Sequence, residues 1–383
     1  MNELPHDHAG GAGDVAVPPA AALPARLLCG PGPSNVPPRV LEALSRPIVG
    51  HLDPAFLAVM DEVSAMLRLV FGTANRATFP VSGTGSAGME AALTNLLEPG
   101  DTAVVCVNGL FGERMCDVAH RCGADVVRVE AEWGRRVEPD AVADALTSHR
   151  GARVLAFVHA ETSTGVESDA AAVCAAASAA APDVLVVVDA VTSLGGTAVE
   201  VDAWGADVCY SGTQKCLAVP PGLAPITFGP RAVERVQTRR TAVQSWYFDL
   251  SLITGYLDER AYHHTAPVSM LAGLHEGLRI VLEEGLASRR DRHVRAGTRL
   301  QAVLEDRGYG LFAAPGARLP QLTTALVPAG IDAAEVRRRL LMERNLEIGA
   351  GVGAHATRMW RIGLMGENAT DAVVDVLLDA LPG

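Results

Sequence analysis

Apolar and polar positions follow two different patterns along the chain, and the pattern changes near residue 267. Before that point, short apolar stretches with strand character alternate with segments of helical spacing. We expect strands at 77–82, 101–107, 125–130, 154–160, 184–190 and 206–212, and helices at 88–97, 114–123 and 168–181. This succession predicts an α/β fold, with a mostly parallel sheet between two layers of helices.

The remaining segments predict a second, smaller unit. Helical spacing runs through 269–286, 287–307 and 333–344, with short strands at 323–329 and 360–365. The first 24 residues are rich in Ala, Gly and Pro, which is typical of a disordered leader. We therefore predict a leader at 1–24, a large domain at 25–285 and a small α+β domain at 286–383.

Composition excludes several classes of function. The chain has 383 residues, 49% of them apolar, and a net charge of −12. No basic cluster suggests nucleic-acid binding, and no apolar stretch is long enough to span a membrane. The seven Cys have no paired spacing, so we expect reduced thiols in a cytoplasmic protein. No His/Cys spacing predicts a metal site.

Lysine occurs once in the chain, at Lys215, although arginine is abundant. Lys215 lies in SGTQKCLAVPPG (211–222), a loop bounded by Gly and Pro after a predicted strand. A Schiff base needs a primary amine that can lose its proton, which lysine can do when buried and arginine cannot. A lone surface lysine is the alternative interpretation.

Asp189 favours the chemical interpretation of Lys215. It ends the almost continuous apolar stretch VLVVVDA (184–190), so it should lie at the carboxyl edge of the sheet, where α/β folds bind ligands. Pyridoxal chemistry needs an anion beside the ring nitrogen, so that the ring can accept electrons. An Asp that only caps a turn is the alternative.

The segment SGTGSAGME (82–90) lies between a predicted strand and helix. Its glycines allow close approach to an anion, Ser82 and Thr84 add hydroxyls, and the next helix points N–H groups at the same place. These features predict a phosphate cradle. The segment also matches G-x-G-x-x-G, which leaves a nicotinamide dehydrogenase as an alternative. That alternative needs an acidic residue ending a later strand, whereas Asp101 begins one.

Two further residues have chemistry that fits this site. Phe111 follows Asn108-Gly109-Leu110 after a predicted strand, where its ring can stack on a flat cofactor or simply fill the core. Arg361 lies near the start of a predicted strand, between Trp360 and Ile362, and a buried arginine there would need a carboxylate, which a substrate could supply.

These residues stand in blocks that together resemble the class V pyridoxal-phosphate-dependent aminotransferases, in particular the alanine–glyoxylate and serine–glyoxylate group. The resemblance begins near Leu28 and continues in order to the C-terminus. It is carried by 30–44, 81–101, 159–166, 188–196, 211–225, 261–270 and 360–370. It implies a fold-type I transferase, whose large domain has a mostly parallel sheet of about seven strands, and pyridoxal 5'-phosphate as cofactor.

The resemblance also implies roles, residue by residue. Lys215 is similar to the lysine that holds the cofactor and moves the substrate proton, and Asp189 to the ring-nitrogen partner. Phe111 stands where the family has a stacking aromatic, often Trp. The other implied cofactor contacts are Ser82, Gly83 and Thr84 at the phosphate, Thr162 near the ring oxygen, and Gln214 beside the lysine.

The remaining implied contacts are with the substrate and with the active site of a neighbouring subunit. Arg361 is similar to the arginine that binds the substrate carboxylate, and Gly32 and Asn35 lie where an N-terminal segment borders the site. Tyr262 and Thr265 match residues that reach the cofactor phosphate of a neighbouring subunit, which implies a homodimer with shared active sites.

The resemblance implies ping-pong transamination, through pyridoxamine phosphate, from alanine or serine to glyoxylate or a related 2-oxo acid. Ureidoglycine–glyoxylate and pyridoxamine–pyruvate aminotransferases, and a lyase, remain alternatives on the same fold. A cysteine desulfurase would need a mobile Cys, and we expect Cys216 to point away from the cofactor. A non-catalytic binding protein would have lost Lys215 or Arg361.

Overall fold

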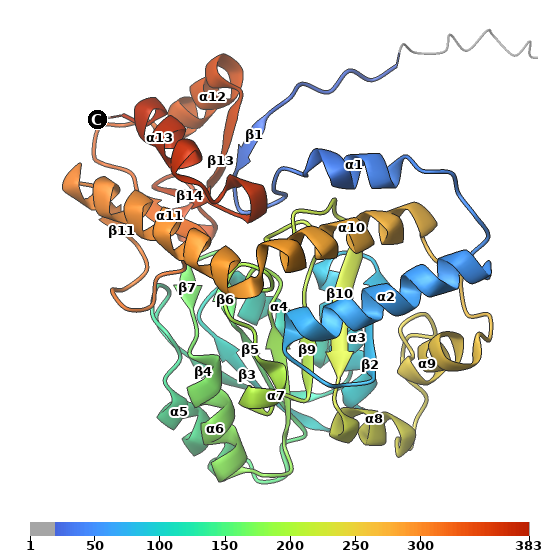
Figure 1. Cartoon of the computed structure of the whole chain (residues 1–383). Coiled ribbons are helices and arrows are strands. Elements are labelled where there is room, and N and C mark those ends of the chain that lie inside the picture. Colours follow the sequence, from blue (N-terminus) through green and yellow to red (C-terminus); the bar gives the residue numbers. More distant parts are fainter. Residues whose placement is uncertain (1–19, 383) are drawn as a thin grey trace, which may run out of the picture.

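The computed structural model describes residues 20–382 and contains two large sheets, with helices packed around them, and a two-stranded sheet (Figure 1). The larger sheet has seven strands, in the order β2 (Ala77–Ser82), β10 (Leu223–Phe228), β9 (Val208–Tyr210), β8 (Leu185–Asp189), β5 (Val154–Val158), β3 (Thr102–Val107) and β4 (Asp125–Glu130). Only β10 runs antiparallel to its neighbours. This confirms the predicted α/β class with a mostly parallel seven-stranded sheet.

Helices cover both faces of this sheet because its strands are apolar on both sides. Val186 and Val188 of β8 belong to one core, while Leu185 and Val187 belong to the other, as expected when side chains alternate along a strand. The first core is closed by α2 (Pro54–Phe71), α5 (Pro139–Ser148), α6 (Ala170–Ala180) and α10 (Val268–Glu284). The second is closed by α3 (Gly85–Leu96), α4 (Leu110–Arg121), α8 (Pro230–Gln237) and α9 (Leu250–Glu259).

The smaller sheet has five strands, in the order β1 (Leu27–Cys29), β13 (Leu346–Ala350), β14 (Met359–Gly363), β12 (Leu322–Leu326) and β11 (Gly310–Leu311). It packs with α11 (Leu286–Asp306), α12 (Ala333–Arg344) and α13 (Asp371–Ala380) around Trp360, which is fully buried. The remaining elements of the described residues are short: α1 (Pro38–Leu44), α7 (Val201–Trp204), β6 (Ala160–Glu161), β7 (Val166–Glu167) and the 3-10 helices η1 (Gly353–His355) and η2 (Gly366–Asn368).

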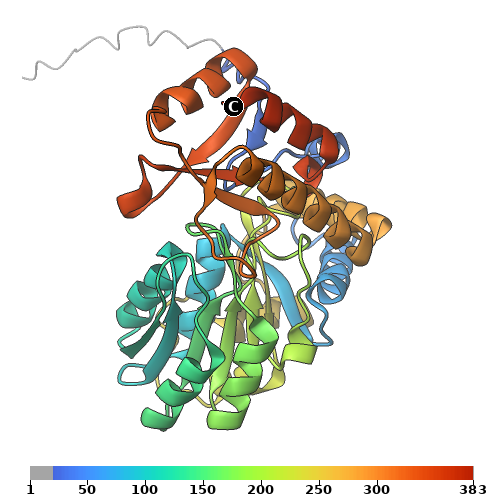
Figure 2. The same ribbon diagram turned by 90° about the vertical axis from the view of Figure 1, so that its left-hand side faces the viewer.

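The smaller sheet and its helices sit over one edge of the larger sheet (Figure 2). β1 pairs in parallel with β13, so the N-terminal strand joins the smaller sheet, although our predicted boundary assigned it to residues 25–285. The three-part division itself stays a prediction. Most of the predicted leader, residues 1–24, lies outside the described residues.

Candidate active site

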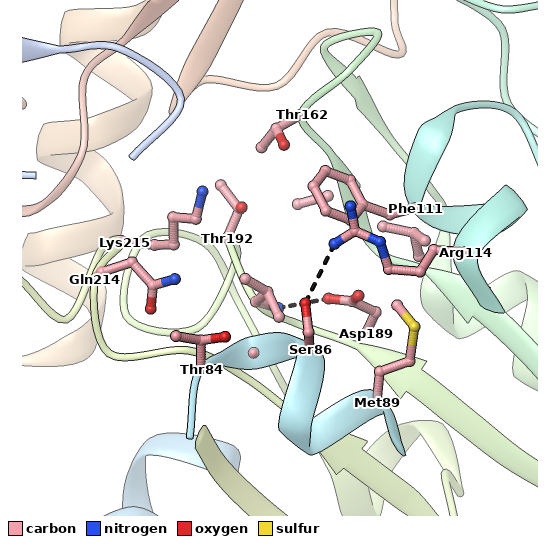
Figure 3. Close-up of a pocket in the computed structure, with 14 residues that line it drawn as sticks. Thr84, Ser86, Met89, Phe111, Arg114, Thr162, Asp189, Thr192, Gln214 and Lys215 are labelled. Atoms are coloured by element: carbon pink, nitrogen blue, oxygen red, sulfur yellow. Dashed lines mark hydrogen bonds between the residues drawn. The ribbon is translucent and has the colours of Figure 1, made fainter. Parts of the chain in front are cut away.

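A cavity opens at the carboxyl edge of the larger sheet, in the loops that follow β2, β3, β5, β8 and β9 (Figure 3). Parallel strands bring their carboxyl ends to one edge, so residues far apart in sequence meet there. Six residues predicted from the sequence line this cavity together: Thr84, Phe111, Thr162, Asp189, Gln214 and Lys215.

Lys215 follows β9 and points its amine into the cavity from the side opposite Phe111 (Figure 3). Its Nζ donates a hydrogen bond to the main-chain oxygen of Pro31. Burial, helped by the positive charge of Arg361, lowers the pKa of Lys215 to about 8. A meaningful fraction of the amine is therefore neutral near physiological pH, as a nucleophilic or proton-accepting lysine requires.

Gly32 borders this lysine directly, in the segment between β1 and α1. A Cβ at Gly32 would lie 2.6 Å from both Cδ and Nζ of Lys215, and the residue has a φ of +102°. Both the contact and the backbone conformation therefore require glycine here. The predicted position of Gly32 at the site thus has a physical reason.

Asp189 ends β8 and is 3% exposed. Its Oδ1 accepts a hydrogen bond from the Val191 N–H at 2.8 Å, and its Oδ2 accepts one from the Tyr210 hydroxyl at 2.9 Å. Burial raises the pKa of Asp189 to about 7, while these two hydrogen bonds act in the opposite direction. The carboxyl group thus stands in a cavity, near the balance between its two protonation states.

Phe111 is the second residue of α4, and Glu161 holds the N-terminus of this helix in place. The main-chain N–H of Phe111 donates to Glu161 Oε2 at 3.0 Å. Ser163 donates to Glu161 Oε1 and accepts from Leu110 N–H at 2.9 Å. A Cβ at Gly109 would overlap Glu161, which explains the glycine before the helix. Glu161 is fully buried and was not singled out from the sequence.

Part of the segment predicted to be a phosphate cradle lines the cavity, and its role at a phosphate stays a prediction. Thr84, Gly85 and Ser86 line the cavity, because α3 already begins at Gly85. Ser82 and Gly83 precede the helix and are not among the lining residues, and Ser82 Oγ instead lies 3.4 Å from His264 Nε2. Their roles at the phosphate stay predictions, which the position of the cavity does not favour.

Arg114 lines the cavity beside Phe111 and was missed in the sequence. Its guanidinium lies 5.0 Å from the centroid of the Phe111 ring, and Nη1 donates to Ser86 Oγ at 3.2 Å (Figure 3). A cation over an aromatic face is favourable. Arg114 thus bridges the predicted stacking ring and the start of α3, one turn of α4 beyond Phe111.

Arg361 reaches toward the cavity from β14 of the smaller sheet. Its Nε donates to the Ala350 oxygen at 2.7 Å and its Nη1 to the Thr162 oxygen at 3.4 Å. Within residues 20–382, no carboxylate forms an ion pair with Arg361. The guanidinium therefore keeps the capacity to bind a carboxylate from outside the chain.

Besides Ser82 and Gly83, three further predicted residues, Asn35, Tyr262 and Thr265, do not line the cavity. The side chain of Asn35 uses its hydrogen bonds within the chain. Its Oδ1 accepts from the Leu28 N–H and from Asn368 Nδ2, and its Nδ2 donates to the main-chain oxygen of Arg26. Asn35 therefore braces β1 rather than lining the cavity. Tyr262, which is 64% exposed, and Thr265, which is also exposed, do not line it either.

Two sequence-level alternatives lose their structural basis. Asp101 precedes β3, at the end of the strand away from the cavity, and accepts a hydrogen bond from Arg235 at 2.7 Å. It therefore cannot serve as the ribose contact of a dehydrogenase. Cys216 is fully buried with its Sγ directed at the Thr192 oxygen, and burial raises its thiol pKa to about 11. It does not line the cavity, so it is not placed to act as the nucleophile of a desulfurase.

The residues of the cavity fit pyridoxal phosphate. Lys215 offers an amine and Asp189 an anion for the ring nitrogen, with Phe111 beside them as an aromatic wall. Gln214 Oε1 is buried without a hydrogen-bond partner among residues 20–382. Thr84, at the N-cap of α3, makes no capping hydrogen bond with its side chain, so the helix N-terminus is available to an anion.

The fold and the site define an aminotransferase. The chain belongs to the class V aminotransferases, whose family description, Aminotransferase class-V, matches residues 27–375. This family depends on pyridoxal phosphate. Across residues 20–382, no helix is long and apolar enough to cross a membrane, and no cluster of three or more His, Cys, Asp or Glu could hold a metal ion.

Three relatives show how far the similarity extends. The crystal structure of an alanine–glyoxylate aminotransferase from Nostoc sp. is 46% identical, with a TM-score of 0.91, covering 94% of this chain and 95% of that one. An alanine–glyoxylate aminotransferase from Drosophila melanogaster is 40% identical over 380 residues, 95% of either chain. The crystal structure of a ureidoglycine–glyoxylate aminotransferase from Bacillus subtilis is 39% identical, with a TM-score of 0.91, covering 94% and 93%.

Proposed function

We propose that this protein binds pyridoxal phosphate in the cavity and transfers the amino group of a small L-amino acid, alanine or serine, to glyoxylate or a related 2-oxo acid. The observation that carries the proposal is the meeting of the chain's single lysine with Asp189 in one cavity of an aminotransferase fold. The relatives named for alanine–glyoxylate transamination support this choice of substrates.

Bound pyridoxal phosphate would accept the electron pair that remains on the substrate's Cα when the bond to its hydrogen breaks. Asp189 would keep the proton on the ring nitrogen, because an anion beside that nitrogen favours its charged form. Lys215 Nζ would take the proton from Cα and return it elsewhere on the reacting group. A pKa near 8 suits both directions of this transfer.

Arg361 would bind and orient the substrate. Its guanidinium can hold a carboxylate through two parallel hydrogen bonds, which also fixes the orientation of Cα. Amino and 2-oxo acids share that carboxylate, so one arginine serves both half-reactions. The positive charge of Arg361 further favours the neutral amine of Lys215, which is the form that accepts a proton.

Ureidoglycine is the second candidate for the amino donor. The Bacillus subtilis relative named for it is about as similar to this chain as the Drosophila relative named for alanine. Pyridoxamine–pyruvate transamination and a lyase reaction remain further outcomes of the same test.

The test is the visible absorbance spectrum of the purified protein, with L-alanine, L-serine and ureidoglycine added in turn. A cofactor band that bleaches with one donor and returns with glyoxylate supports the proposal and identifies the donor. A band that responds to pyridoxamine or to no amino acid redirects the substrate assignment. No band, even after pyridoxal phosphate is added, overturns the proposal.

We also propose a homodimer with shared sites, in the cytoplasm. Tyr262 and Thr265 are exposed and lie outside this chain's cavity, which suits residues that complete a neighbouring site. All seven cysteines are buried and free, which fits a reducing compartment. Sedimentation tests the assembly, and a fully active monomer contradicts it.

A further inference from the structure

The geometry points to Tyr210 as a positioning residue for Asp189, one that fixes the orientation of the carboxyl group and favours its anionic form. This inference rests on the proposed function, because Asp189 matters chemically only if the cofactor binds. It adds a residue that does not line the cavity and has no sequence signature of its own.

The positions of the two residues follow from strand pairing. β8 and β9 run in parallel, with Asp189 in register with Tyr210. The Ala190 N–H donates to the main-chain carbonyl oxygen of Tyr210 at 2.8 Å, so the two main chains are held together beside the carboxyl group of Asp189. The Tyr210 hydroxyl donates to Asp189 Oδ2 at 2.9 Å. Both residues are almost completely buried.

The tyrosine ring has little freedom to leave this position. It lies under α3, where a Cβ on Gly88 would be 3.1 Å from both Cβ and Cδ2 of Tyr210. The next residue of α3, Met89, lines the cavity. Gly88 thus lets the helix that begins at the predicted phosphate cradle pack directly on the ring. The hydroxyl is thereby held at one place relative to both Asp189 and α3.

The charge balance at Asp189 explains why this hydrogen bond matters. Within the described part of the chain, no basic side chain forms an ion pair with Asp189, and the charges that act on it at longer range are those of Glu161, which raises its pKa, and of Lys215, which lowers it. The carboxyl group of Asp189 accepts one hydrogen bond on each oxygen, from the main-chain N–H of Val191 and from the Tyr210 hydroxyl. Burial raises the pKa of Asp189 to about 7. A hydrogen bond to the charged form opposes burial, so its loss would raise the pKa further and leave less carboxylate at neutral pH.

The test compares Tyr210→Phe with the matched control Tyr309→Phe. Tyr309, in the core around the smaller sheet, is also buried, and its hydroxyl donates a hydrogen bond to the main-chain oxygen of Pro382. For each purified protein, we would measure the affinity of the apoenzyme for pyridoxal phosphate and the pH dependence of the bound cofactor's absorbance and of kcat/KM.

We expect Tyr210→Phe to bind the cofactor about ten- to a hundredfold more weakly, the worth of a hydrogen bond to a charged group. Its acid-side midpoint should move to higher pH by about one unit. Tyr309→Phe should change neither quantity. A purely structural role for Tyr210 would lower stability without moving the midpoint.

A second variant keeps the test decisive if Tyr210→Phe folds poorly. Incorporating 3-fluorotyrosine at position 210 preserves the shape but makes the hydroxyl a stronger donor, so the midpoint should move to lower pH. Midpoints unchanged in both variants would overturn the inference while the proposed function stands. A parent protein that binds no pyridoxal phosphate would overturn both.

Discussion

Arg289 on α11 donates a hydrogen bond from Nη2 to the main-chain oxygen of Cys216, the residue that follows Lys215, at 2.8 Å. Its Nε donates to the Gly195 oxygen at 3.0 Å, and its Nη1 pairs with Glu284. The side chain is 1% exposed. One buried arginine therefore ties the first helix after α10 to two loops at the carboxyl edge of the larger sheet, including the loop that carries the lysine.

We predict that Arg289→Ala lowers the free energy of unfolding by about 3–5 kcal/mol, because it leaves buried polar partners without a cation. The matched control is Arg338→Ala, whose ion pair with Glu335 is 59% and 47% exposed. The control should cost about 0–1 kcal/mol. Urea denaturation of the three proteins measures both values, and equal losses would contradict a special role for Arg289.

Glu284 gives a pH dependence with a defined sign. Burial alone would raise its pKa, but hydrogen bonds and charges from Arg292 and Arg289 lower it to about 2, from an ordinary value of 4.5. The pKa is lower in the folded state, so the stabilisation is present above pH 4.5 and is lost as the pH falls toward 2. We predict that Glu284→Gln flattens the fall of Tm across this window. A parent-like slope in the variant would show that other carboxylates dominate.

Gly32→Ala should disturb the lysine more than it disturbs the fold. The new Cβ would lie 2.6 Å from Lys215 Nζ, whereas at Gly316, with a φ of +79°, a Cβ meets no atom within 4 Å. Both substitutions strain the backbone by about 1 kcal/mol. We therefore predict similar losses of Tm, but weaker cofactor absorbance and activity only in Gly32→Ala. Equal cofactor content in the two variants would contradict the contact.

Arg361→Ala should act on substrate binding. We predict that KM for amino and 2-oxo acids rises about ten- to a hundredfold, the worth of a hydrogen-bonded charge, while the cofactor still binds. Arg358→Ala is the control, because Arg358 is exposed and stands just before the same strand. Steady-state kinetics with both substrates checks the prediction, and an unchanged KM removes Arg361 from the substrate site.

Glu161→Gln should loosen the N-terminus of α4 at Phe111. In Gln one of the two carboxylate oxygens is replaced by an NH2 group, so that group faces either the Ser163 or the Phe111 N–H, both of which already donate to this side chain. We predict a loss of about 1–3 kcal/mol in stability and weaker cofactor binding. Glu132→Gln, at a side chain that is 78% exposed, is the matched control. Cofactor titration and thermal melting test the pair, and a variant with parent-like affinity would mean that Glu161 does not position Phe111.

The sequence by itself determined the elements with the strongest local patterns. The strands predicted at 77–82 and 125–130 and the helix at 333–344 have the same bounds in the structure. Their periodicity, caps and flanking turns lie within each segment, so no distant residue is needed to specify them. β10 was missed because LAPITF follows a Pro-rich loop and looks like its continuation, whereas pairing with β2 and β9 decides its place.

The chemistry of the site divides in the same way. Lys215 and Asp189 were predictable because the reaction demands an amine and an anion, and each followed a readable apolar strand. The start of α3 at Gly85 was not, because a glycine-rich segment leaves the first helical residue undefined, and the lining residues shifted accordingly. Glu161, Arg114 and Tyr210 act through partners at distant positions. Only the tertiary structure sets those contacts, because strand register and helix packing, not local sequence, bring the partners within hydrogen-bond distance.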